Sequence, residues 1–337
     1  MDNTIIYEDA RSIIDHVDLS PFTNKKILIT GATGLIGTYF LYSISEYVKQ
    51  GKVINKVYAV TMNGLPDHLK DLESEEWLEV LKGDLSEDSF LERLPPVDFI
   101  IHAAGYGQPA KFVIDESKTI KLNTYVTFKL LDLLNDGGKF LFVSSSGIYN
   151  GLDKPVFYEE DVGTTNTLHP RACYIEGKRC GEAICNSYRK KGIDAKSARV
   201  SYSYGPGVRA GDERALYSFI KKGFTGDINL LDNGSAQRIY CYITDVAEML
   251  FNILLYGKEP LYNVGGKDVI TIYELATLIA HELDAKVHIP SVNDAVPGNA
   301  NVERLSIEKV QNEFNKKKFT DINEGIKRTI KWMENYR

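Results

Sequence analysis

The sequence predicts an α/β protein with a doubly wound parallel sheet and a smaller C-terminal α/β cap. Nearly continuous apolar β-type runs alternate with helical patterns through the first two thirds of the chain. Strands of this kind are buried on both faces, as in parallel sheets covered by helices. The last third changes to short strands and helices around Gly and Pro turns, which indicates a separate cap at the carboxyl ends of the strands.

The alternation assigns each element in order. Residues 5–17 predict an amphipathic helix, and further helices are expected at 35–49, 117–135 and 172–191. The β-type runs are "KILIT", "KVYAV", "LEVLKGDL", "VDFIIHAAG", "KFLFVSSSGIY" and "DAKSARVSYSYG". We therefore expect an N-terminal helical extension at 1–24, a Rossmann-type dinucleotide-binding domain at 25–200, and a cap at 201–337 with some segments returning to the Rossmann domain.

Composition excludes several classes of protein. The chain has 337 residues, 43% apolar content and a formal net charge of −6, so nothing suggests nucleic-acid binding. The N-terminus carries acids and an arginine where a signal peptide needs an apolar core, and no stretch approaches a membrane span. We expect a cytoplasmic protein with no membrane partner. The four cysteines form no CxxC pair, so we expect neither a disulfide framework nor a metal site.

The segment "GATGLIG" joins the first strand to the first long helix of the sheet. Small residues let a backbone turn approach a pyrophosphate, whose charge is met by free N–H groups at the helix start. The three glycines are spaced evenly, unlike the two-then-three interval of the usual dinucleotide fingerprint. The cofactor-binding residues expected in this turn are Gly31, Thr33, Gly34, Leu35, Ile36 and Gly37.

The adenosine end of the expected cofactor leaves its identity open. The second strand ends in Thr61 and Asn63, with neither the acid that binds the NAD ribose nor the arginine that clamps a 2′-phosphate. The cofactor is therefore NAD or NADP. In "GDL", Asp84 with Leu85 is expected to reach the adenine. "HAAG" is expected to bring Ala103, Ala104 and Gly105 near the ribose, with His102 a packed strand-end residue.

A catalytic group is expected where the serine strand meets a later helix. Ser145 ends the strand, and in "YIEGK" Tyr174 and Lys178 stand four residues apart, on one helical face. A nearby ammonium favours a phenolate, so we expect Lys178 to lower the pKa of Tyr174 toward neutrality. Tyr174 would then exchange a proton with a sugar hydroxyl while hydride passes to or from a nicotinamide, with Ser145 orienting the same oxygen.

With these segments in this order, the chain from about residue 25 to about residue 330 resembles the extended short-chain dehydrogenase/reductase family, in its NAD-dependent epimerase/dehydratase branch that modifies nucleotide sugars. "KLNT", "YGPG" and "QRIYCYITD" carry the resemblance further. It implies that Ser145 and Tyr174 are catalytic, that Lys178 anchors the cofactor, and that Asn123 supports the active-site helix.

The resemblance also implies that the cap holds the nucleoside diphosphate of the substrate. The resemblance implies that Arg238 contacts its pyrophosphate or ribose, and an arginine fork suits phosphate oxygens. Arg209 and Arg214 are further candidates, and Ser146 and Tyr202 are expected near the sugar. Tyr202 stands where related enzymes often have Asn or His.

Two residues at the serine strand narrow the expected reaction. Related 4,6-dehydratases carry an Asp-Glu pair, and glucuronate decarboxylases a glutamate, where this chain has Ser146 and Gly147. The dehydratase and the decarboxylase therefore rank as alternatives below the favoured reactions, because the carboxylate that would carry the proton is missing. The favoured reactions are a 4-epimerase or a 4-keto reductase acting at carbon 4 of a nucleoside-diphosphate sugar. A non-catalytic dinucleotide-binding protein is a further alternative.

The resemblance implies a homodimer. In that arrangement the helix around 117–135 and the Tyr174 helix pack into a four-helix bundle with their copies. The apolar spacing of "IKLNTYVTFKLLDLL" is compatible with two buried faces, one toward the sheet and one toward a partner.

Overall fold

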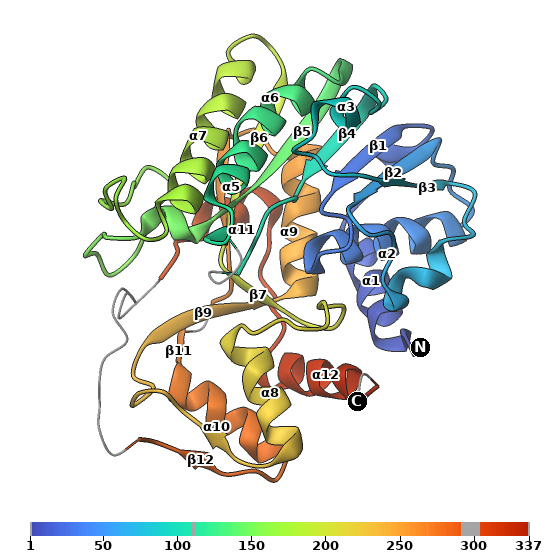
Figure 1. Cartoon of the computed structure of the whole chain (residues 1–337). Helices are drawn as coiled ribbons and strands as arrows, with labels where there is room; N and C mark the ends of the chain where they lie inside the picture. The colour runs from blue at the N-terminus through green and yellow to red at the C-terminus, as the bar shows by residue number, and fades with distance from the viewer. Residues whose placement is uncertain (1, 109–111, 268, 291–303, 336–337) are drawn as a thin grey trace.

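The computed structural model describes residues 2–108, 112–267, 269–290 and 304–335. A seven-stranded sheet with helices on both faces forms the upper part of Figure 1, and a smaller lobe lies below it. The predicted α/β fold is confirmed. No helix in these residues is both long enough and apolar enough to cross a membrane.

The large sheet is parallel throughout and has the strand order β10-β6-β5-β4-β1-β2-β3. Its strands are β1 (Lys26–Thr30), β2 (Lys56–Thr61), β3 (Leu78–Lys82), β4 (Val97–His102), β5 (Leu134–Ser145), β6 (Asp194–Val200) and β10 (Leu261–Val264). The order reverses between β1 and β4, which pair through Thr30 and His102 at their carboxyl ends. In doubly wound sheets a ligand crevice forms at this reversal.

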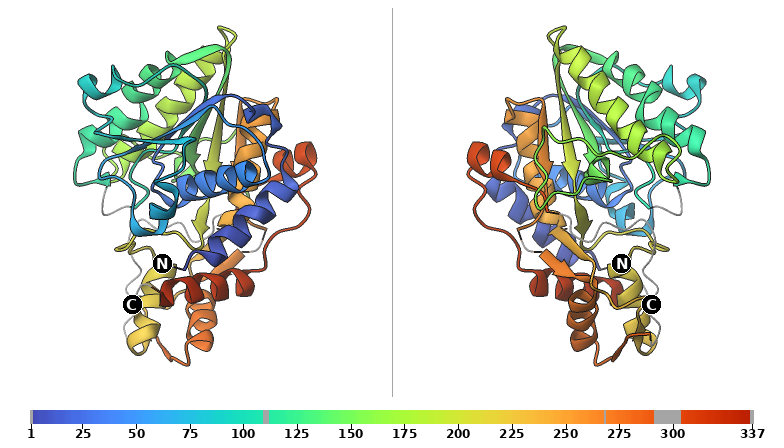
Figure 2. Two further views of the ribbon diagram at one scale, coloured as in Figure 1. Left: turned by 90° about the vertical axis from the view of Figure 1, so that its right-hand side faces the viewer. Right: turned by 90° about the vertical axis from the view of Figure 1, so that its left-hand side faces the viewer.

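Helices cover both faces of the sheet, as the two side views show (Figure 2). The helices associated with one face are α1 (Thr4–His16), α2 (Leu35–Lys49) and α9 (Ile243–Tyr256); those with the other are α3 (Asp88–Leu91), α5 (Glu116–Asn123), α6 (Tyr125–Leu131) and α7 (Ala172–Arg189). Along β1, Ile27 and Ile29 pack into one core cluster and Leu28 into the other. This alternation follows from the period of two residues in a strand.

The lower lobe contains two small sheets and three helices (Figure 1). One sheet joins β7 (Tyr202–Tyr204), β9 (Gln237–Tyr242) and β11 (Val269–Thr271), and the other joins β8 (Ile228–Asn229) and β12 (Val287–His288). The helices are α8 (Ala215–Thr225), α10 (Ile272–Glu282) and α12 (Ile322–Glu334). The chain leaves this lobe for α9 and β10 of the large sheet, with α11 (Glu308–Phe314) packed nearby.

The prediction of one continuous helix over 117–135 is wrong. The structure breaks it at Thr124, whose φ of −117° and ψ of −80° separate α5 from α6. The hydroxyls of Thr124 and Thr127 donate to the carbonyls of Ile120 and Asn123, each at 2.8 Å. Side chains that bond the carbonyl four residues back bend helices. The predicted helices at 5–17, 35–49 and 172–191 correspond to α1, α2 and α7.

Helix α1 fastens the lower lobe to the sheet through a buried carboxylate. Asp9 accepts hydrogen bonds from the hydroxyls of Tyr39 and Tyr242 at 2.8 and 2.7 Å. Arg328 of α12 donates to the other Asp9 oxygen at 2.8 Å. Burial raises the pKa of Asp9 despite the opposing charge of Arg328. Four elements, α1, α2, β9 and α12, therefore meet around one ion pair.

Candidate active site

The glycine turn lies at the switch point of the sheet, between β1 and α2. Gly31 has a φ of +68°, and a Cβ added there would lie 2.5 Å from the carbonyl oxygen of Ala103. A Cβ on Gly37 would lie 2.5 Å from the carbonyl oxygen of Gly31. The turn therefore requires glycine at both positions, because backbone passes where side chains would stand.

The start of α2 is free to bind an anion. Its N-cap is Gly34, which has no side chain with which to cap the first-turn N–H groups. Such groups, with the positive end of the helix dipole, bind phosphate. Leu35 and Ile36 open this first turn, as predicted, and the cradle suits a dinucleotide pyrophosphate.

The "HAAG" segment packs beside the turn. The N–H of Ala103 donates to the Thr30 carbonyl at 3.2 Å, and that of Ala104 to the Thr30 hydroxyl at 3.2 Å. His102 lies buried between the Thr30 hydroxyl, 2.7 Å from Nδ1, and the Leu122 carbonyl, 3.0 Å from Nε2. Burial lowers the pKa of His102 to about 3, so its imidazole is neutral. His102 is thus a packed strand-end residue, as expected.

At the adenosine end, two of the predicted contacts are already engaged within the protein. The Thr61 hydroxyl closes a turn with the backbone of Gly64, whereas Asn63 is exposed. One Asp84 oxygen accepts from the Lys118 ammonium at 2.5 Å, and the other from the N–H and hydroxyl of Ser86. These bonds lower the pKa of Asp84 despite its partial burial. Leu85 beside it is buried.

The three predicted catalytic residues converge where β5 meets α7. The Lys178 ammonium donates to the Val143 carbonyl at 2.7 Å and lies 5.9 Å from the centre of the Tyr174 ring. The Ser145 hydroxyl accepts from the N–H of Gly147 at 3.0 Å, and Ser145 lies close enough to Tyr174 to act on the pKa of its phenol. Lys178 is buried and Tyr174 half-buried. The serine hydroxyl and the phenol can therefore address the same substrate oxygen.

The sequence argument expected a lowered pKa for Tyr174, and the structure instead raises it. In the protein without ligands, burial raises the phenol pKa above 10, although the bond to Ser145 and the charge of Arg214 oppose this. The cost of desolvating Lys178 lowers the lysine pKa to about 8. Desolvation therefore outweighs the lysine charge that the sequence argument relied on.

Asn123 lies near Lys178 and has a side-chain oxygen that could accept a hydrogen bond from a ligand. Its Nδ2 donates to the Thr119 carbonyl at 2.8 Å, while its buried Oδ1 has no hydrogen-bond partner among the described residues. An atom at the Cβ position of Gly105 would lie 3.9 Å from both Asn123 Oδ1 and Lys178 Nζ. An orphaned acceptor and an ammonium around this open point suit the polar ribose of a nicotinamide dinucleotide. Asn123, Lys178 and the glycine turn would hold the cofactor.

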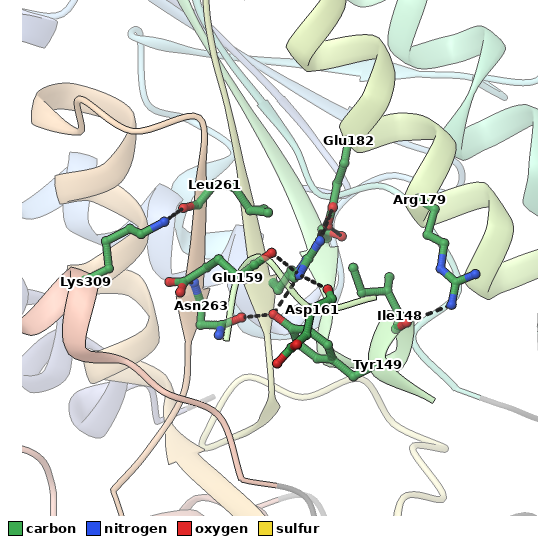
Figure 3. A network of polar contacts seen from close by, with 11 residues as sticks. Ile148, Tyr149, Glu159, Asp161, Arg179, Glu182, Leu261, Asn263 and Lys309 are labelled. Atoms are coloured by element: carbon green, nitrogen blue, oxygen red, sulfur yellow. Dashed lines mark hydrogen bonds and ion pairs between the residues drawn. The ribbon is translucent and has the colours of Figure 1, made fainter. Parts of the chain in front are cut away.

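A buried polar network holds the serine strand in place (Figure 3). Glu182 of α7 accepts from the Ser144 hydroxyl at 2.5 Å and from Arg199 Nη2 at 2.8 Å. Arg199 Nη1 donates to the Tyr149 hydroxyl at 2.7 Å, and that hydroxyl donates to Asn263 Oδ1 at 2.7 Å. The segment that carries Ser145 is therefore fixed at both ends.

Four of the predicted substrate residues lie in the lower lobe or beside the serine strand, and the fifth, Arg209, lies at the glycine turn. Tyr202 and Arg238 meet through the β7–β9 pair, with the guanidinium 5.8 Å from the tyrosine ring centre. Arg214 Nη1 donates to the Ser203 carbonyl at 3.1 Å, and its charge reaches Tyr174. Ser146 opens the 3-10 turn η3 (Ser146–Tyr149), just past Ser145.

Arg209 departs from this group. It reaches the glycine turn, where its Nε donates to the Thr33 carbonyl at 2.9 Å. Sequence reasoning also missed Phe112, whose ring stacks on Tyr174 with centres 4.7 Å apart and planes at 11°. The sequence named Arg209 only as a substrate candidate, and no local pattern predicts either contact, because both join distant segments.

Comparison with known proteins agrees with this architecture. A model of the NAD dependent epimerase/dehydratase family matches residues 27–265. UDP-glucuronic acid decarboxylase 1 of Danio rerio is 27% identical over 317 residues, which cover 93% of this chain and 74% of the relative. UDP-glucuronic acid decarboxylase 6 of Arabidopsis thaliana is 27% identical over 307 residues, which cover 90% of this chain and 87% of the relative.

Solved structures share the fold. The dTDP-glucose 4,6-dehydratase DesIV from Streptomyces venezuelae, with NAD and TYD bound, superposes with a TM-score of 0.80 at 23% identity, covering 93% of this chain and 98% of that one. UDP-glucuronic acid 4-epimerase from Bacillus cereus, in complex with UDP-glucuronic acid and NAD, gives 0.76 at 21% identity, covering 93% and 100%. With the family model spanning most of its length, the chain belongs to the NAD dependent epimerase/dehydratase family and is an NAD-dependent enzyme of the short-chain dehydrogenase type.

Proposed function

We propose that the enzyme performs oxidoreduction at carbon 4 of a nucleoside-diphosphate sugar, as a 4-epimerase or a 4-keto reductase. One observation carries the proposal: Tyr174, Ser145 and Lys178 converge without a carboxylate at the strand end. Gly147 stands there instead, and a Cβ on it would lie 3.3 Å from both Ser145 Oγ and Tyr174 Cε1. The site therefore has machinery for proton and hydride exchange but no further acid at this position.

The residues divide the chemistry as follows. Tyr174 takes the proton of the sugar hydroxyl, the Ser145 hydroxyl orients that oxygen, and Lys178 stabilises the phenolate. A nicotinamide dinucleotide, which the glycine turn, Asn123 and Lys178 would hold, would supply the hydride acceptor for carbon 4. In an epimerase the keto sugar turns over before the hydride and proton return to it. In a reductase, hydride addition to a keto substrate completes the reaction and a fresh reduced cofactor must follow.

We further propose that Arg238, Arg214 and Tyr202 hold the nucleoside diphosphate in the lower lobe. Two cationic forks beside an aromatic ring suit phosphate oxygens and a flat base or sugar. The relatives named for UDP-glucuronic acid and the epimerase in complex with it make UDP-glucuronic acid the first substrate to test.

The same relatives favour a decarboxylase as the second candidate. Oxidation at carbon 4 of a uronic acid places a ketone β to the carboxylate, so carbon dioxide can leave once the ketone forms. The resulting carbanion then needs a proton. Gly147 supplies none, which is why this reaction ranks second.

Product analysis separates the candidates. The purified enzyme is incubated with UDP-glucuronic acid, with UDP-glucose and, in the presence of NADPH, with a nucleoside-diphosphate 4-keto sugar, and products are followed by mass spectrometry and proton NMR. An isomer of unchanged mass indicates the epimerase. A keto sugar reduced only with NADPH indicates the reductase, while loss of carbon dioxide or of water would overturn both and establish the decarboxylase or the dehydratase.

We also propose a homodimer through α5, α6 and α7. Ile120 and Phe128 expose 44% and 41% of their surfaces on α5 and α6. Exposed apolar side chains on adjoining helices suit burial against a second copy. Size-exclusion chromatography with light scattering should give twice the chain mass, and a monomer at micromolar concentration would contradict the proposal.

A further inference from the structure

The loop between β7 and α8 belongs to the lower lobe, yet it touches the cofactor turn of the large sheet. Arg209 in this loop donates from Nε to the Thr33 carbonyl at 2.9 Å and from Nη2 to the Thr33 hydroxyl. Nearby, a Cβ on Gly207 would lie 3.0 Å from Thr38 Cγ2 on the first turn of α2. Backbone and guanidinium thus both approach the start of the helix that cradles phosphate.

Arg209 has no carboxylate partner among the described residues, unlike Arg199, Arg214 and Arg328. Arg199 pairs with Glu182, Arg214 with Asp212 and Arg328 with Asp9. Within residues 2–108, 112–267, 269–290 and 304–335, no carboxylate lies in ion-pair range of Arg209, whose recorded side-chain partner is Thr33.

Arg209 is an exposed residue, so water still solvates part of its charge. The surrounding protein nevertheless lowers the pKa of its guanidinium by partial desolvation, and no neighbouring anion opposes that shift. The start of α2 beside it carries the positive end of the helix dipole. Two positive groups that adjoin without an anion are what an anionic ligand would stabilise.

Arg209 lies near the segment that follows β2, on the side of the glycine turn where the adenosine half of the cofactor is expected. His68 lies in the segment that follows β2, 3.3 Å from the Thr38 hydroxyl. Burial, together with the charge of Arg209, lowers the pKa of His68 to about 4, so this imidazole is neutral near pH 7. In this fold the segment after the second strand borders the adenosine ribose. Arg209 is the cation on that side of the turn.

We propose that Arg209 binds a phosphate of the nicotinamide dinucleotide from the side of the lower lobe. It would take the place of the clamp that Thr61 and Asn63 do not provide. Two phosphates are within this chemistry: the pyrophosphate, which NAD and NADP share, and the 2′-phosphate, which only NADP carries. The inference depends on the dinucleotide alone and holds whichever sugar reaction the enzyme performs.

Binding measurements test the assignment without any turnover. The full-length protein is freed of cofactor, and NADH, NADPH and UDP are titrated by calorimetry into the wild type, Arg209→Met and Arg209→Lys. Loss of a charge-assisted hydrogen bond should weaken binding roughly tenfold or more in Arg209→Met. Arg209→Lys should recover part of the loss, because it keeps the charge but not the fork.

A matched control removes an arginine at the opposite edge of the sheet. Arg189 ends α7 and pairs with Asp194 at the start of β6, so Arg189→Met should bind both dinucleotides as the wild type does. Weaker binding of both cofactors to Arg209→Met assigns the pyrophosphate, and weaker binding of NADPH alone assigns the 2′-phosphate. Unchanged binding of both would overturn the proposal, as would a loss confined to UDP, which would return Arg209 to the substrate site.

Discussion

The two ends of the active site are built in different ways. Behind the serine strand, charged groups pair inside the protein: Glu182 holds Arg199 and Ser144, and Arg199 holds Tyr149. At the glycine turn, the backbone N–H groups at the helix start and Arg209 carry positive charge with no carboxylate partner among the described residues. The network behind the serine strand therefore needs no ligand, whereas the glycine turn gains a counter-charge only when an anion binds. Chemistry and cofactor binding should therefore respond to different substitutions.

The largest effect is expected at the serine strand. Tyr174→Phe removes the proton carrier and should lower turnover by roughly 10² to 10⁴-fold. Affinity for NADH should be nearly unchanged, because the cradle and Lys178 remain. Product formation and a calorimetric titration check the two halves. Full activity in this variant would end the catalytic assignment, and lost NADH binding would mean that the two ends are not independent.

The turn should show the reverse pattern. Gly31→Ala brings a Cβ within 2.5 Å of Ala103 O at a φ of +68°, so the turn must shift and dinucleotide binding should fall below detection. Gly51→Ala is the matched control, since it shares a positive φ of +79° but meets no atom within 4 Å. It should cost about 1 kcal/mol of stability and leave binding intact. Equal binding losses in the two variants would show that close approach is irrelevant.

The internal network should matter for stability. Glu182→Gln leaves the Arg199 guanidinium without its buried counter-ion, and breaking such pairs costs about 3 to 5 kcal/mol. Urea unfolding of the ligand-free protein measures the loss. The exposed pair of Lys70 and Glu73 offers the comparison, because Glu73→Gln should change stability by less than about 1 kcal/mol. Similar losses in both variants would show that burial of the first pair contributes nothing.

The smallest effect concerns Lys178, whose pKa is lowered to about 8 by burial. Between about pH 8 and the ordinary lysine value of about 10.4, the unfolded chain binds the proton more tightly than the native protein does, so this residue makes stability rise with pH. Below pH 8 its cost is constant. Lys178→Met removes the cost, so its stability advantage over wild type should shrink by about 3 kcal/mol at most across this window. A constant difference in urea unfolding would contradict the lowered pKa.

The sequence was informative where structure depends on local patterns. Apolar runs and helical periods located six of the seven strands of the large sheet and helices α1, α2 and α7, because burial on both faces leaves a continuous apolar signature. The seventh strand, β10, comes from the last third of the chain, which the sequence assigned mainly to the cap. The family model and the related structures confirm the fold and the NAD-dependent chemistry. The roles of Ser145, Tyr174 and Lys178 stay predictions, although the structure brings the three residues together.

Sequence patterns did not predict features that depend on contacts between distant residues or on side-chain hydrogen bonds within a helix. The break at Thr124 arises from hydroxyl groups that bond their own helix, which apolar spacing does not record. Arg209 meets Thr33 across 176 residues of chain, so no local pattern could place it at the cofactor turn. The pKa of Tyr174 depends on how much water the folded site excludes, and residue spacing alone contains no measure of that.

The ion pair of Asp9 and Arg328 has a consequence for how the molecule assembles. The two residues are 319 positions apart, so the contact closes a very long loop and costs more chain entropy than pairings within the sheet. Contacts of such separation form late, after the sheet has brought α1 and α2 together. Until Arg328 arrives, the Asp9 carboxylate lacks its counter-ion. We therefore expect docking of α12 to be a late step in folding, and its release to be among the first openings that hydrogen exchange detects.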